Sequence, residues 1–111
     1  MIVGLGLDVV ETSRIEEAMQ NPRFLSRILT DREREICHTV HRVAGRWAAK
    51  EAIAKAVGLK LSWQDVEVLP DGDGRPMANV VGLPQGLLLH VTISHEKGVT
   101  AAVAILERPD R

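Results

Sequence analysis

The run from about Arg42 to Val57 constrains the fold of this chain most strongly. It is rich in alanine, the residue with the highest intrinsic helix propensity, and Gly58 follows it where a glycine commonly ends a helix. The run therefore predicts the strongest helix of the chain. Most of the sequence before this run has helical patterns, and the sequence after it has strand patterns.

The first residues of the chain predict a strand. Ile2–Val10 is rich in β-branched residues and leucine, which is typical of a buried strand. Gly4 and Gly6 lie inside this run, and glycine within a strand often marks a site where another backbone approaches closely. We therefore expect a buried strand with a second element packed tightly against its glycines.

Two shorter helices and one helical turn are predicted between this strand and the long helix. The helices begin with capping-box patterns, in which a hydroxyl side chain and an acidic side chain three residues later satisfy free backbone groups. The three signals are Ser13 with Glu16, the apolar run from Phe24 to Leu29, and Thr30 with Glu33. We expect the first helix to stop at Asn21-Pro22 and the last to continue through about Val40.

The second half of the chain alternates between apolar and polar residues, which is typical of strands. The predicted strands are Val66–Leu69, Met77–Val81, Leu87–Ser94 and Val99–Leu106. The last two are expected to form a hairpin through a loop that contains Glu96-Lys97-Gly98. Helices thus precede strands, with one strand leading, and this segregation predicts an α+β fold.

The composition limits the class of protein. A chain of 111 residues fits a single domain, 1–111, and its 26% charged residues exclude a membrane protein and a weakly hydrophobic disordered chain. The apolar start is too short to span a membrane. Cys37 is the only cysteine, so a disulfide-stapled secreted scaffold is excluded and a cytoplasmic location is expected.

Charge is distributed unevenly along the chain. Residues 23–60 carry nine Arg or Lys against four Asp or Glu, whereas residues 62–111 carry four against seven. This pattern allows a basic surface that faces a phosphate or an acidic partner, although a solvated helix face explains it equally well. The whole chain, with a net charge of −1, does not predict nucleic-acid binding.

Two motifs do not support the chemistry that they first suggest. Gly4 and Gly6 resemble the start of a dinucleotide-binding loop, but Val9 stands where the third glycine is required. Ser94 and His95 are adjacent on a predicted strand, so their side chains point to opposite faces. Ser94 therefore cannot readily use His95 as its base, and nucleophilic catalysis by this pair is not expected.

Asp8 lies near the end of an apolar strand, where an unpaired carboxylate would be costly. It could cap the following helix, pair with an arginine, or bind a metal ion together with a second carboxylate. The best-placed partner is Glu51, which shares a helical stripe with Ala44, Ala48 and Lys55. A surface ion pair between Glu51 and Lys55 is the simpler interpretation of that stripe when it is taken alone.

Several stretches together resemble the holo-acyl-carrier-protein synthases, which are small phosphopantetheinyl transferases. The stretches that carry the resemblance are Gly4–Glu11, Phe24 with Ile28–Thr30 and Glu33, Ala44–Ala52 with Lys55-Ala56, Gly74–Pro76, and His90–His95. They occur in the family's order and span nearly the whole chain. The resemblance implies an antiparallel-rich sheet packed against a long helix, in a protein of fatty acid biosynthesis.

The resemblance also implies an activity. Members transfer the 4′-phosphopantetheine arm of coenzyme A to a serine hydroxyl of an apo-acyl carrier protein and release adenosine 3′,5′-bisphosphate. They require Mg²⁺, whose carboxylate ligands correspond to Asp8 and Glu51, and Lys55 would add a positive charge at the same phosphates. Arg46 and Lys50 are expected to bind other phosphates of the nucleotide. The base that accepts the serine proton stays open between Glu51 and a metal-activated water.

The remaining expectations concern partners. Arg14, Arg23 and Arg27 are the candidate contacts for the acidic carrier, following the family's basic first-helix region. Family members are homotrimers with active sites between subunits, and Ser94-His95 is the expected contribution of the neighbouring chain. Two alternatives stay open, a non-catalytic oligomeric module that binds nucleotides and a Mg²⁺-dependent phosphohydrolase.

Overall fold

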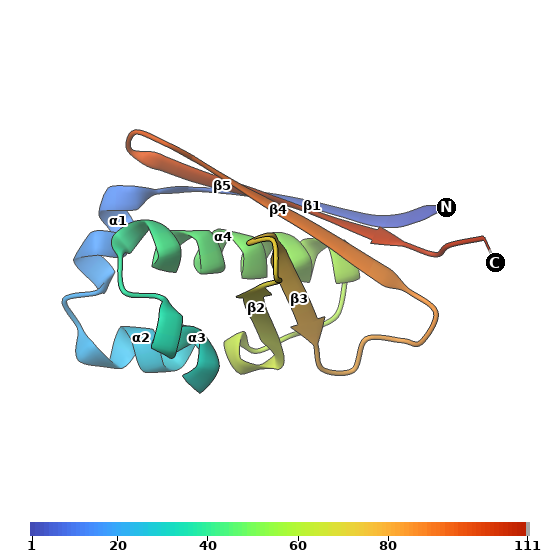
Figure 1. Ribbon diagram of the computed structural model, residues 1–111, viewed down its shortest axis with the longest axis horizontal. Coiled ribbons are helices and arrows are strands. Elements are labelled where there is room, and N and C mark those ends of the chain that lie inside the picture. Colours follow the sequence, from blue (N-terminus) through green and yellow to red (C-terminus); the bar gives the residue numbers. More distant parts are fainter. Residues whose placement is uncertain (111) are drawn as a thin grey trace.

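A computed structural model describes residues 1–110. Figure 1 shows the order of its elements. They are β1 (Ile2–Glu11), α1 (Thr12–Ala18), α2 (Pro22–Ile28), α3 (Asp31–Ile36), α4 (Val40–Val57), the 3₁₀ turn η1 (Trp63–Asp65), β2 (Val66–Pro70), β3 (Pro76–Val80), β4 (Leu88–Glu96) and β5 (Val99–Glu107). The predicted α+β class is confirmed.

The helix α4 separates two layers. On one side lies an antiparallel sheet with the strand order β1-β5-β4, and on the other lie α2, α3 and the two-stranded sheet β2-β3 (Figure 1). The helix ends as predicted, at Gly58, which adopts the left-handed conformation with φ 73°. The β4-β5 hairpin is also confirmed, and Lys97-Gly98 forms its turn.

β1 packs directly on the backbone of α4, as its glycines predicted. A Cβ atom on Gly4 would overlap the carbonyl oxygen of Ala56, and one on Gly6 would overlap that of Ala52. Only glycine allows so close an approach, and Ala52 and Ala56 present little side-chain bulk of their own. The strand and the helix are therefore held at a fixed register.

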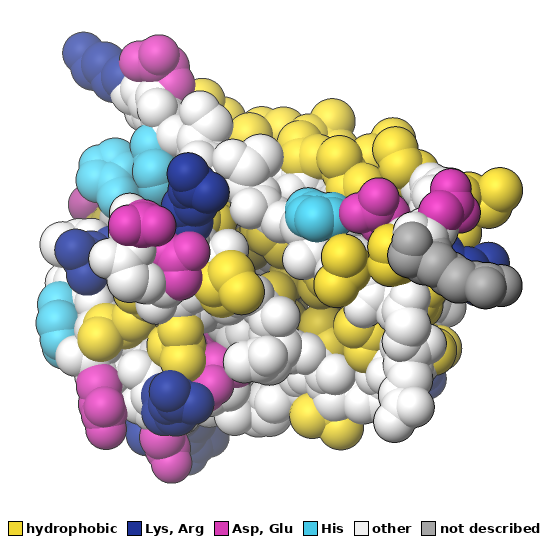
Figure 2. Space-filling view, turned by 45° about the vertical axis from the view of Figure 1, so that its right-hand side comes forward, with side chains coloured by type: hydrophobic (Ala, Val, Ile, Leu, Met, Phe, Trp, Pro, Cys, Tyr) yellow, Lys and Arg dark blue, Asp and Glu magenta, His cyan; other side chains and the backbone are white. Residues whose placement is uncertain are grey.

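The prediction that β1 is a buried strand is correct for one face only. Leu5, Leu7 and Val9 point away from α4, with 56–66% of their surface exposed. They stand opposite Ile105, Val103 and Ala101 of β5 respectively, so they form one continuous apolar surface, which we call the outer sheet face. Figure 2 shows apolar side chains gathered along the top of the molecule, where this sheet lies.

Two helix boundaries differ from the predictions. The capping box of Ser13 and Glu16 is absent, because α1 begins earlier, at Thr12, whose N–H donates to the Gly98 carbonyl of the β-hairpin. The box of Thr30 and Glu33 is confirmed, but its helix ends at Ile36 instead of about Val40. The chain leaves the helix there because the Thr39 hydroxyl accepts from the Arg42 N–H and starts α4.

The chain's three aromatic residues form a single stack. The ring centroids of Phe24 and Trp47 lie 5.8 Å apart, and those of Trp47 and Trp63 lie 4.5 Å apart. The stack joins α2, α4 and η1, so the few aromatic side chains are concentrated where three elements meet. Within residues 1–110, no helix has the length and hydropathy that crossing a membrane requires.

Candidate active site

Asp8 lies against α4. Side chains alternate along β1, and the residues that face α4 are Gly4 at Ala56, Gly6 at Ala52 and then Asp8. Two strand residues advance about as far as one helical turn, so Asp8 lies level with the turn of α4 that precedes Ala52. The sequence of β1 thus places a carboxylate against α4, within reach of Lys55.

The carboxylate of Asp8 pairs with a lysine. Its Oδ1 lies 3.6 Å from Nζ of Lys55, and that ammonium also donates to the Leu7 carbonyl over 2.9 Å. The side chain of Asp8 is 17% exposed and that of Lys55 is 56% exposed. The two simpler hypotheses for Asp8 are wrong, because its partner is not an arginine and because Glu11 occupies the N-cap of α1.

Glu51 is a half-buried residue of α4. Within residues 1–110 its carboxylate makes no hydrogen bond and no ion pair, so the expected surface pair with Lys55 is absent. It lines a cavity of about 200 Å³ together with Leu61, Ser62 and Trp63. A carboxylate that is held at a cavity without a protein partner is available to a ligand.

Asp8 and Glu51 are both hard oxygen donors carried by elements that pack on each other, β1 and α4. Within residues 1–110 there is no group of three or more His, Cys, Asp or Glu side chains that could enclose a metal ion. Mg²⁺ is bound in proteins through one or two carboxylates, with water and phosphate oxygens completing its octahedron. The donor set therefore fits Mg²⁺ accompanied by a phosphate ligand better than a closed structural metal site.

A second group of polar side chains lies at the β4 edge of the sheet. Arg42, Arg46 and His95 line a cavity of about 220 Å³. The Nε of Arg46 donates to the Val68 carbonyl over 3.1 Å, which fixes the guanidinium at this wall. The sequence reasoning missed Arg42, although its spacing of four from Arg46 on a helix was a usable signal.

His95 is oriented by its surroundings. Its Nδ1 lies 3.0 Å from Oγ1 of Thr100, and its ring meets that of His41 edge-on with 5.7 Å between centroids. Burial lowers the pKa of His95, and the neighbouring His41 and Arg46 lower it further. One ring nitrogen is engaged by Thr100, which leaves the other free to contact a ligand.

Ser94 and His95 point to opposite faces, as their adjacency on a strand predicted. Thr100, which stands opposite His95, is fully buried beneath the sheet, whereas Ser94 stands opposite Ala101 and is exposed. Val9 also stands opposite Ala101, so Ser94 belongs to the outer sheet face. Within one chain, Ser94 therefore does not join the cavity that His95 lines.

The expectation that Lys50 binds a phosphate of the nucleotide is wrong. Its side chain is only 2% exposed and points into the protein. Its Nζ donates to Glu33 Oε1 and to the carbonyls of Ile28 and Trp63, at 2.7, 2.8 and 2.9 Å. An ammonium has three N–H bonds, so none is left for a ligand.

The three arginines predicted to contact a carrier lie around one hollow. Arg14 of α1 and Arg23 and Arg27 of α2 line a cavity of about 820 Å³ on the protein surface. Glu17 also lines it, and Phe24 forms part of its floor. The fold thus collects positive charge from two consecutive helices, although α1 alone is net acidic.

Comparisons with known proteins find one family over nearly the whole chain. Residues 4–105 match the model of the 4′-phosphopantetheinyl transferase superfamily. A holo-[acyl-carrier-protein] synthase of an Exiguobacterium strain is 45% identical over 117 residues, which cover 96% of this chain and 93% of that protein. One from Halalkalibacterium halodurans is 42% identical and covers 97% and 98%.

Solved structures of holo-acyl-carrier-protein synthases have a similar fold over nearly the whole chain. A holo-(acyl-carrier-protein) synthase from Bacillus anthracis, in complex with CoA (3′,5′-ADP), superposes with a TM-score of 0.88 at 38% identity and covers 98% of this chain and 99% of its own. The Helicobacter pylori enzyme in complex with coenzyme A superposes with a TM-score of 0.83 at 26% identity and covers 93% and 99%.

Proposed function

The chain belongs to the 4′-phosphopantetheinyl transferase superfamily, and we propose from this premise that it is a holo-acyl-carrier-protein synthase. In that reaction the serine hydroxyl of an apo-acyl carrier protein attacks the phosphorus that bears the pantetheine arm of coenzyme A. The bond from that phosphorus to adenosine 3′,5′-bisphosphate breaks, and the serine proton passes to a base. The observation that carries the proposal is Glu51, a half-buried carboxylate of α4 that lines a cavity and has no partner within residues 1–110.

We propose Mg²⁺ as the metal, held by Asp8 and Glu51. These donors support the choice because they are hard oxygens, they come from apposed elements, and a pyrophosphate can supply further ligands. When bound, the ion neutralises charge that develops on the phosphates during transfer. Asp8 reaches this position because Gly4 and Gly6 let β1 rest on the α4 backbone.

Lys55 and the cavity at the β4 edge are assigned to the phosphates of coenzyme A. The Lys55 side chain is long and more than half exposed, so its ammonium can turn from Asp8 toward a bound pyrophosphate. Arg46 and His95 face the second cavity, where a fixed guanidinium and a ring N–H suit a phosphate monoester. Glu51 and water remain the two candidates for accepting the serine proton.

A homotrimer with shared active sites explains two features of the single chain. The outer sheet face is a contiguous apolar surface, and such surfaces typically mark interfaces. The Asp8 group lies at the β1 edge of the sheet and His95 at the β4 edge, with β5 between them. Association through this face would bring one chain's β4 edge, including Ser94, to the β1 edge of another.

We also propose that residues 1–111 form one transferase domain in the cytoplasm. The superfamily match extends from residue 4 to residue 105, so it leaves only short ends uncovered. Burial raises the pKa of the Cys37 thiol, so this cysteine is an unreactive part of the core that suits a reducing compartment.

The carrier is proposed to dock on the hollow lined by Arg14, Arg23 and Arg27, because acyl carrier proteins are acidic.

Arg14→Glu is expected to raise the KM for the carrier by about tenfold and to change kcat little, because a charge at the rim of an interface acts mainly on the rate of encounter. Steady-state kinetics with varied carrier measure this. Arg108→Glu, directly after β5, whose end lies far from α1 and α2 in Figure 1, is the control. An unchanged carrier KM in Arg14→Glu would remove this residue from the interface.

Product release separates the proposed function from its alternatives. A transferase releases adenosine 3′,5′-bisphosphate from coenzyme A only when apo-carrier is present, and in equal amount to the carrier modified. A phosphohydrolase releases phosphate products without a carrier, and a binding module releases none. Chromatography measures the adenosine 3′,5′-bisphosphate released with and without apo-carrier. Release that does not depend on the carrier would contradict the proposal.

A further inference from the structure

The buried ion pair between Glu33 and Lys50 has no part in the mechanism above, yet it joins the elements that form both cavities. Glu33 is fully buried on α3, and the Lys50 side chain is 2% exposed on α4. Burial lowers the pKa of Lys50, while its hydrogen bond to Glu33 opposes that shift. Pairs of this kind contribute little net stability compared with apolar side chains of similar volume. Its presence therefore calls for another explanation.

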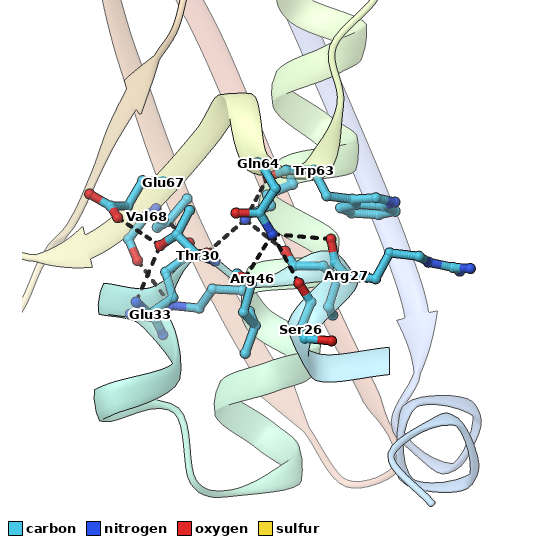
Figure 3. A network of polar contacts seen from close by, with 12 residues as sticks. Ser26, Arg27, Thr30, Glu33, Arg46, Trp63, Gln64, Glu67 and Val68 are labelled. Atoms are coloured by element: carbon cyan, nitrogen blue, oxygen red, sulfur yellow. Dashed lines mark hydrogen bonds and ion pairs between the residues drawn. The ribbon is translucent and has the colours of Figure 1, made fainter. Parts of the chain in front are cut away.

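One branch of contacts leads to the cavity that Glu51 lines. Lys50 directly precedes Glu51 on α4, and its ammonium donates to the carbonyl of Trp63. Trp63 forms a wall of that cavity. The next residue, Gln64, donates to the carbonyls of Ser26, Arg27 and Leu29, and Figure 3 shows its amide directed toward Ser26 and Arg27. The wall opposite Glu51 is thus tied to α4 by Lys50 and to the end of α2 by Gln64.

A second branch leads to the cavity that Arg46 lines. Glu33 Oε2 accepts from the Val68 N–H over 2.7 Å, and the Val68 carbonyl accepts from Arg46 Nε. Figure 3 shows Glu33, Val68 and Arg46 in this sequence of contacts. The backbone N–H and carbonyl of Val68 therefore bond to side chains, where another strand could otherwise pair with β2. The position of the Arg46 guanidinium follows from that of the β2 edge, which Glu33 holds.

We infer that the Glu33–Lys50 pair is a positioning element of the active site, which sets the Trp63 wall and the Arg46 guanidinium relative to Glu51. The inference rests on the transferase function proposed above. Neither residue touches the reacting atoms. A directed ion pair with saturated hydrogen bonds fixes distances between α3, α4, η1 and β2, which an apolar contact of the same volume does not do. Small displacements of binding groups are known to reduce rates strongly.

The test replaces the pair without leaving a lone buried charge. The double variant Glu33→Gln/Lys50→Met keeps the shape and one acceptor oxygen, which serves either the Val68 N–H or the Thr30 N–H. We expect it to fold and to bind coenzyme A more weakly, with kcat/KM for coenzyme A reduced about 100-fold. The KM for the carrier should stay within about twofold, since neither Glu33 nor Lys50 bonds to a residue that lines the arginine hollow. Calorimetry measures the dissociation constant of coenzyme A. Steady-state kinetics measure kcat/KM for coenzyme A and KM for the carrier.

Ile53→Ala is the matched control, because Ile53 is a fully buried residue of α4 without polar contacts. It lowers the melting temperature while leaving the pair intact, so its kinetics well below melting should equal those of the wild type. If the double variant loses no more coenzyme A affinity than Ile53→Ala, the inference is wrong. Transfer by the wild type, measured alongside, tests the proposed function separately.

A single variant covers the case in which the double variant does not melt cooperatively. Glu33→Gln alone leaves Lys50 its two carbonyl partners and weakens the charged contact. We expect reduced affinity for coenzyme A with an unchanged carrier KM. Wild-type affinity for coenzyme A in this folded variant would overturn the inference.

Discussion

Glu51→Gln is expected to lower kcat by about 100- to 1,000-fold, the cost of removing one electrostatic group from a transition state. Gln has nearly the same shape but lacks the charge and is a weaker metal ligand. Because Glu51 has no protein partner within residues 1–110, the substitution removes no contact that stabilises the fold. The melting temperature should therefore remain unchanged while transfer nearly stops.

The kinetic assay should include Mg²⁺ titration, since a weakened ligand set raises the metal concentration needed for half-maximal rate. Glu35→Gln, an exposed residue of α3, is a charge-matched control and should retain full activity. Near-normal turnover by Glu51→Gln at ordinary Mg²⁺ concentration would contradict the role assigned to Glu51.

Leu7→Glu should abolish assembly and, with it, most of the activity. Leu7 lies in the middle of the outer sheet face, 56% exposed in the single chain and opposite Val103. A carboxylate that becomes buried in an interface without a partner costs several kcal/mol. In the monomer the same side chain faces water, so the chain should still fold.

Sedimentation velocity combined with the transfer assay measures both effects. The wild type should sediment as a trimer and Leu7→Glu as a folded, poorly active monomer. Leu59→Glu replaces an exposed leucine that follows α4, outside the outer sheet face, and should remain trimeric. A Leu7→Glu monomer with full activity would show that the site is complete within one chain.

The sequence predicted those parts of the fold and site that depend on local pattern. Alanine content and Gly58 located α4, and two glycines in an apolar strand predicted the close contact with its backbone. Asp8 and Glu51 became candidates because carboxylates are conspicuous on an apolar strand and an alanine-rich stripe. Their proposed role as Mg²⁺ ligands came from the family resemblance, since the spacing alone favoured a Glu51–Lys55 pair.

Features created by tertiary contacts could not be predicted. Lys50 and Glu51 are neighbours of opposite charge on one helix, and only packing against α3 and η1 determines which side chain is buried. The capping box correctly assigned Glu33 to a helix start, but it gave no sign that the same carboxylate reaches Lys50 and Val68. The outer sheet face was misjudged for a similar reason, because apolar residues predict burial without saying whether folding or assembly supplies it.

The most direct test of the proposed function is the mass of an apo-acyl carrier protein after incubation with the protein, coenzyme A and Mg²⁺. The account predicts that the carrier gains one phosphopantetheine group, on its serine, and that EDTA prevents the gain. Excess Mg²⁺ added after EDTA should restore it. A carrier whose mass stays unchanged with Mg²⁺ present, or increases equally in excess EDTA, would contradict the account.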